Sequence, residues 1–145
     1  MSKLTTQKNK KGFTLIELLI VIAIIAILAI IVFAALDPVT RFADARNSRR
    51  FSDVNTVLTA VHEYIVDNDG VLPPGLSTAL ATTELGTCGP CVDLSTPLAP
   101  YLKTIPVGSQ GSAANTGYSV EVNANNIVTI SADNAENSAV IEVSR

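Results

Sequence analysis

The sequence has no tryptophan, one histidine and two cysteines, and only 5% of its residues are aromatic. His62 has no nearby Cys or His that would complete a ligand set, so we expect a solvated helix position rather than a metal or catalytic role. Without a basic patch interleaved with aromatics, a nucleic-acid-binding domain is not expected. The sequence also lacks a readable Ser/His/Asp set, a glycine-rich phosphate loop and a paired-carboxylate cleft. It therefore predicts no enzyme activity and no cofactor.

Charged residues are scarce and unevenly placed. They make up 16% of the 145 residues, whereas 48% are hydrophobic, which excludes intrinsic disorder and collagen-like repetition and favours one small domain. The four basic residues before Phe13 are all lysines, and from Phe13 onward 6 basic and 13 acidic residues give a net charge of −7. The overall charge of −3 is thus the sum of a basic N-terminal segment and an acidic remainder.

A long apolar run follows the lysines. Residues 18–36 are 19 consecutive apolar residues, long enough as a helix to cross roughly 30 Å of hydrocarbon. A cleaved secretory signal is the weaker alternative, because its apolar region usually spans only about 7–15 residues. An uncleaved anchor is the stronger one. Basic residues flank the run on both sides, so their distribution alone does not predict which end of the helix faces the cytoplasm.

Glu17 is the exception within this apolar segment. An acidic side chain at the centre of a membrane helix costs about 2.5–3.5 kcal/mol, and Glu17 near the end still needs a partner. The segment contains no base that could pair with it. If the chain were cut between Gly12 and Phe13, the new α-ammonium group of Phe13 could meet Glu17 of a neighbouring subunit and set the stagger between subunits.

The stretch Lys-Gly-Phe-Thr-Leu-Ile-Glu-Leu-Leu at residues 11–19, followed by the apolar run, resembles the prepilin signature of type IV pilins and type II secretion pseudopilins. The resemblance implies that a membrane aspartyl prepilin peptidase cleaves after Gly12 and methylates the amine of Phe13. Residues 1–12 would then be a cytoplasmic leader and Glu17 the assembly carboxylate. Many family members have a proline late in the run where this chain has Ala34.

The same resemblance implies a function and a location. The chain would be a structural subunit of a type IV pilus or a type II secretion pseudopilus, without direct nucleic-acid binding. Its partners would be the prepilin peptidase, identical or homologous subunits in a helical homopolymer, the inner-membrane assembly platform, and membrane lipid before assembly. It would cross the inner membrane once with the head outside, and then enter an extracellular or periplasmic filament.

The remaining pattern predicts an α+β fold. Residues 13–36 form the membrane and filament-core helix, residues 37–66 its amphipathic continuation, and residues 67–145 a globular head. Asp37 and Pro38 suit a break with a restart, as N-cap and first helical residue. A short helix is predicted after Thr96. About three antiparallel strands are expected to pack on the amphipathic helix and cover its apolar stripe: Tyr118–Val122, Ile127–Ser131 and Val140–Val143.

Charged residues of the amphipathic helix and of the last loop are candidate binding sites. The helix carries Arg41, Arg46, Arg49 and Arg50 together with Asp37, Asp44 and Asp53. A solvated face with weak salt bridges is the favoured interpretation, and contact with lipid head groups and acidic neighbours is the alternative. Asp133 and Glu136 in the last loop are too sparse to predict a calcium site.

The two cysteines, Cys88 and Cys91, form a Cys-Gly-Pro-Cys tetrapeptide. The same four residues occur in thioredoxin-like enzymes, where a strand precedes them and a long helix follows. Neither element is readable here, so a structural disulfide in an oxidising compartment is favoured. A membrane-anchored thiol-disulfide oxidoreductase and an anchored binding domain that never polymerises remain as alternative functions.

Overall fold

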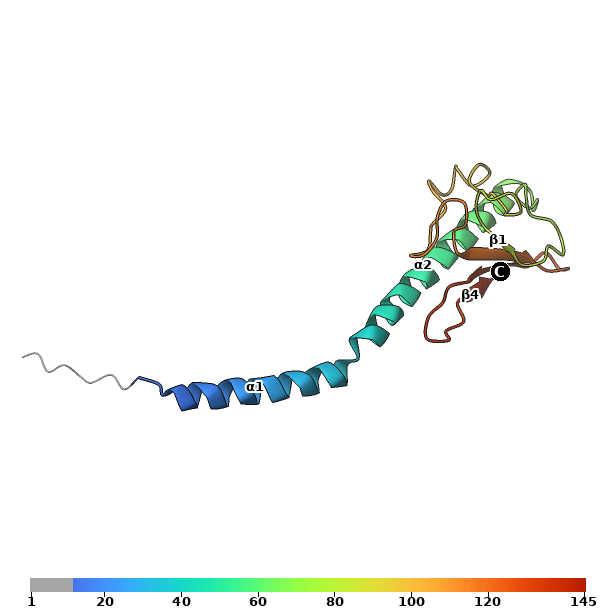
Figure 1. The fold of residues 1–145 in the computed structure, drawn as a ribbon. Coiled ribbons are helices and arrows are strands. Elements are labelled where there is room, and N and C mark those ends of the chain that lie inside the picture. The colour runs from blue at the N-terminus through green and yellow to red at the C-terminus, as the bar shows by residue number, and fades with distance from the viewer. Residues whose placement is uncertain (1–11) are drawn as a thin grey trace, which may run out of the picture. The chain divides into compact units, whose positions relative to one another are not determined.

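The computed structural model describes residues 12–145 (Figure 1). Residues 1–11, which include most of the predicted leader, lie outside the described residues. The chain divides into two compact units, with the boundary between Pro38 and Val39. The first contains helix α1, and the second contains most of helix α2 and a small sheet.

Helix α1 spans Leu15–Leu36. Thr14 caps its start in an extended conformation, and Asp37 follows its last residue. Asp37 has a φ of 36°, in the left-handed region, which is the conformation of a residue that ends a helix, so it is the C-cap of α1 as well as the residue before α2. The predicted restart is present, since Pro38 is the first residue of the next helix, where its missing N–H and fixed φ are tolerated.

Helix α2 spans Pro38–Asp67 and supplies one side of the core. Val54, Val57, Leu58 and Val61 recur at helical spacing, and each is at most 4% exposed. The helix ends where Asp69 and Gly70 both take positive φ angles, which break the helical hydrogen-bond pattern.

The sheet is antiparallel, with strand order β1-β2-β3-β4. Its strands are β1 Thr83–Glu84, β2 Tyr118–Val122, β3 Val128–Ala132 and β4 Glu142–Ser144. The α+β prediction is confirmed, and the sheet has four strands rather than three because the two-residue β1 pairs with β2. Val120 opposes Ile130, and Val122 opposes Val128. All four of these side chains are buried with the apolar stripe of α2.

Two local predictions are corrected. The segment after Thr96 forms a run of turns rather than a helix, because Pro97 and Pro100 have no N–H to donate and the bonds mix three- and four-residue spacing. The last strand begins at Glu142 rather than at Val140, whose side chain is 82% exposed.

Candidate functional site

The residues predicted to be processed stand at the start of α1. Gly12 and Phe13 precede the helix, and the Phe13 side chain is 93% exposed. The peptide bond between them lies outside regular secondary structure. An exposed bond outside regular secondary structure is one that a peptidase can reach.

Thr14 and Glu17 form a reciprocal capping box. The Thr14 amide and hydroxyl both donate to Oε2 of Glu17, at 2.8 and 2.9 Å, and the Glu17 amide donates to the Thr14 hydroxyl at 3.2 Å. This arrangement satisfies backbone donors that a helix start leaves open. It also gives the carboxylate hydrogen bonds within its own chain. Among residues 12–145, no salt bridge of Glu17 is found.

The rest of α1 is apolar on every side. None of its residues is buried within the chain. The helical stretch that begins at Leu15 contains a window of mean hydropathy 3.5, long and apolar enough to cross a membrane. A helix that is apolar all round and uncovered by its own chain requires lipid or other protein around it.

Comparison with known proteins supports this interpretation of the N-terminal segment. Residues 7–33 match the family model described as the prokaryotic N-terminal methylation motif. The chain carries a prepilin-type signature. This signature is that of type IV pilins and pseudopilins, which are structural proteins, and it contains Gly12, Phe13, Thr14 and Glu17. No curated protein and no solved structure matches the chain.

Outside the prepilin-type signature, Cys88 and Cys91 are joined as a disulfide. The residues between them form a turn, in which the Cys91 amide donates to the Cys88 carbonyl at 3.1 Å. The long helix that lowers the thiol pKa in thioredoxin-like sites does not follow Cys88 here. The geometry therefore supports a loop closure and lacks the elements that activate a redox thiol.

One arginine of α2 is less exposed to solvent than predicted. Arg50 is 3% exposed, and it donates to Glu136 at 2.9 Å, to Asn47 at 2.8 Å and to Ser109 at 3.3 Å. Arg46 binds the same Glu136 carboxylate through two nitrogens. The interpretation as a solvated face is thus wrong for Arg50, because a partner 86 residues away covers it.

Glu136 is fixed by its backbone as well. Its amide donates to Asn47 at 3.0 Å, and its carbonyl accepts from the same side chain at 2.8 Å. Hydrogen bonds from Arg46 are the main cause that lowers the pKa of Glu136 to about 2, and Arg50 adds to it. We name these four residues, Arg46, Asn47, Arg50 and Glu136, the arginine clamp. It joins α2 to the loop between β3 and β4.

The arginine clamp affects whether the last loop could bind calcium, because Arg46 and Arg50 already bind the Glu136 carboxylate. Asp133 accepts a hydrogen bond from Ser119 at 2.7 Å. In residues 12–145, no group of three or more His, Cys, Asp and Glu residues is arranged to hold a metal ion.

His62 is half-buried rather than fully solvated, and its Nε2 atom is buried without a hydrogen-bond partner among the described residues. Sequence reasoning missed this burial, since His62 lies at the edge of the apolar stripe of α2. It also missed the clamp, whose partners are far apart in sequence. The Thr14–Glu17 pair did have a readable signal, the Thr-x-x-Glu spacing before an apolar run.

Proposed function

We propose that this chain is a structural subunit of an extracytoplasmic helical filament, either a type IV pilus or a type II secretion pseudopilus. Residues 1–12 are a leader that prepilin peptidase removes, and the mature chain begins at a methylated Phe13. Residues 13–36 anchor the subunit in the inner membrane and then form the filament core. Residues 37–66 and the head, 67–145, face outward. The observation that carries this proposal is an acidic side chain at the start of an uncovered apolar helix, inside a prepilin-type signature.

Cleavage changes the chemistry next to Glu17. Before it, the carboxylate has the two hydrogen bonds from Thr14. After it, an ammonium group exists at Phe13, adjacent in sequence to the threonine. In a bundle of subunits, the ammonium of one chain pairs with Glu17 of a neighbour, and the low dielectric of the apolar surroundings strengthens that attraction. Because the pair joins fixed positions on two helices, it sets their axial stagger.

The membrane and the assembly platform supply the remaining partners. The leader lysines stay on the cytoplasmic side, and the acidic head lies outside. An oxidising exterior also suits the disulfide of the head. The assembly platform at the inner membrane then moves processed subunits from lipid into the growing filament.

The test combines intact mass with one variant. The cell-surface protein is expected to begin at Phe13 with one added methyl group, and an intact Met1 terminus would contradict the proposal. Glu17→Ala should abolish filaments while the protein stays processed and bound to the membrane. Glu63→Ala, which removes an exposed glutamate from α2, is the matched control and should assemble normally. Normal filaments from Glu17→Ala would count equally against the proposal.

A further inference from the structure

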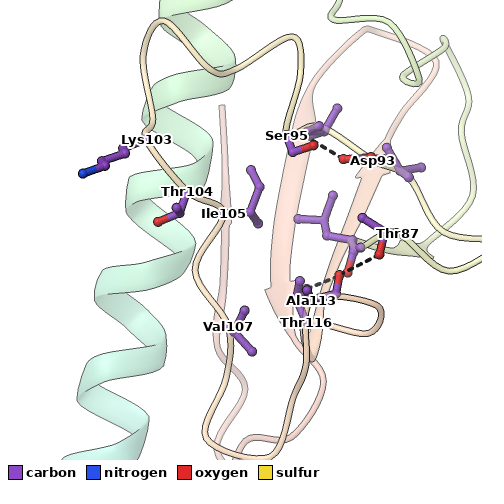
Figure 2. Close-up of a pocket in the computed structure, with 13 residues that line it drawn as sticks. Thr87, Asp93, Ser95, Lys103, Thr104, Ile105, Val107, Ala113 and Thr116 are labelled. Atoms are coloured by element: carbon purple, nitrogen blue, oxygen red, sulfur yellow. Dashed lines mark hydrogen bonds between the residues drawn. The ribbon is translucent and has the colours of Figure 1, made fainter.

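The head contains a preformed cavity of about 230 Å³ (Figure 2). Its walls are mainly apolar and include Leu85, Val92, Leu94, Ile105, Val107 and Ala113. Small-molecule sites usually measure about 300–1,000 Å³, so this cavity is better matched to one large side chain than to a free ligand.

Short contacts between two loops fix one wall of the cavity. The amides of Thr87 and Cys88 donate to the carbonyls of Ala113 and Ala114, both at 3.1 Å. A Cβ atom on Gly86 would lie 2.1 Å from the Ala114 carbonyl oxygen, so only glycine permits this approach. The Cys88–Cys91 disulfide closes the same loop. These constraints keep the opening in place without a ligand.

The rim of the cavity carries one charge of each sign. Asp93 and Lys103 line it, both are exposed, and Figure 2 shows them on opposite sides. The Asp93 carboxylate accepts a hydrogen bond from the Ser95 amide at 2.9 Å, and hydrogen bonding with Ser95 lowers the pKa of Asp93. Asp93 therefore presents a negative charge at neutral pH.

The start of α2 has the complementary features. Val39 and Phe42 lie one turn apart on the same helix face, and they are 75% and 65% exposed. Arg49 is two turns beyond Phe42, and its side chain is 70% exposed. Its nearest acidic atom is on Asp53, at 3.8 Å, which is a weak contact at such exposure.

Phe42 cannot fill the cavity of its own chain. Ser109 contacts Arg50, and Tyr101 contacts Asp67, so residues 101–109 run beside the later part of α2. Phe42 lies eight residues before Arg50, roughly 12 Å further along the helix axis. A second copy is therefore needed to bring the two apolar surfaces together.

We propose that Phe42 of one subunit inserts into this cavity of a second subunit, with Arg49 of the first facing Asp93 of the second. This inference rests on the proposed filament function. One contact covers an apolar cavity and an apolar helix face, and pairs the opposite charges beside them. The two surfaces differ, so the contact is heterologous, and repeated heterologous contacts that do not close produce an open helical filament.

The test uses two co-produced full-length chains, one with Phe42→Cys and one with Thr104→Cys. Thr104 lines the cavity and is exposed, and the two native cysteines are already paired. Mild oxidation of sheared filaments is expected to cross-link the two chains. Phe51→Cys replaces Phe42→Cys in the matched control, because Phe51 is 52% exposed on the same helix but on the opposite flank of its buried stripe. No cross-link at Phe42, or an equal yield at Phe51, would overturn the proposal.

A charge exchange tests the polar part of the contact. Arg49→Asp and Asp93→Arg should each lower filament yield at least about tenfold by opposing like charges across the interface. The chain carrying both substitutions should recover most of that loss. Two single losses without recovery in the double variant would count against the pairing.

The outcomes separate this contact from the function on which it rests. Filaments with a Phe13 terminus but neither cross-link nor recovery would leave the function standing and overturn the contact. The absence of filaments from the unmodified chain would overturn both. Full reaction of Phe42→Cys with a water-soluble thiol reagent in sheared filaments would show that this side chain is uncovered after assembly, and it would overturn the contact as well.

Discussion

Helices α1 and α2 follow one another along the chain but bury their side chains in opposite ways. No residue of α1 is buried, whereas α2 buries Ala43, Arg50, Val54, Val57, Leu58, Ala60 and Val61. Helix α2 is an ordinary amphipathic helix whose partner is its own head. Helix α1 has apolar side chains without an intramolecular partner. The head therefore folds on contacts within the chain, whereas α1 requires lipid or other protein around it.

A charge placed on each helix should show the difference between α1 and α2 with the largest effect. Val57→Asp puts a carboxyl group at a position that is 0% exposed, and burying it unpaired, even after it takes up a proton, should remove a large part of the roughly 5–15 kcal/mol that stabilises a domain. Val32→Asp on α1 should leave the head folded and instead oppose membrane insertion by about 2.5–3.5 kcal/mol. Protease resistance of the head, measured on the full chain in detergent micelles, distinguishes the two. A folded head in Val57→Asp would contradict the assignment of the core.

Two leucine substitutions, one in each helix, test the same difference in burial without adding a charge. Leu58 is 4% exposed and Leu28 is 56% exposed. Leu58→Ala should lower the free energy of unfolding of the head by about 2–5 kcal/mol, because it leaves a cavity. Leu28→Ala should not move the denaturant midpoint of the head. Equal shifts in the two variants would mean that α1 also stabilises the head.

The third effect concerns the disulfide of the head. Cys88 and Cys91 close a loop with a sequence separation of 3, so replacing both by serine should cost less than the roughly 3 kcal/mol expected of a 15-residue loop. The denaturant midpoint of the serine variant should equal that of the unmodified chain with reductant. A loss as large as that of Leu58→Ala would show that the loop contributes more to the core than its contacts indicate.

The smallest effect is expected from pH, acting through the arginine clamp. The pKa of Glu136 falls from its usual 4.5 to about 2 in the folded head, mainly through hydrogen bonds from Arg46. A depressed carboxyl pKa adds stability above the unfolded value, and this is lost as the pH falls from about 4.5 toward 2. Urea midpoints across that range should fall for the unmodified chain. They should fall less for Glu136→Gln, with Glu63→Gln as the control.

Local pattern predicted much of this structure. Length and hydropathy identified the apolar helix, and Pro38 marked the start of α2 because proline suits that position. The strand Tyr118–Val122 was predicted with its observed bounds. These features depend on residues close together in the sequence.

Long-range contacts explain what the sequence did not reveal. Strand β1 has only two residues and exists because Thr83 and Glu84 pair with β2 about 35 positions later. Arginine is usually a surface residue, and the buried Arg50 is satisfied by hydrogen bonds to Asn47, Glu136 and Ser109, two of which are far away in the sequence. At the candidate site, the residues of the prepilin-type signature are contiguous and could be identified from the sequence. The cavity that we propose as a docking surface could not, because the fold brings together separate segments between residues 85 and 116 to form it.

The uniform apolar surface of α1 has an energetic consequence. Lipid tails are as apolar as leucine side chains, so moving this helix from a bilayer into a bundle of like helices changes little in hydrophobic free energy. In the filament that we propose, polymerisation would then be nearly balanced, with its direction set by the few polar contacts and by the work that an assembly machine supplies. The same balance would let a released subunit return to the membrane intact and be used again.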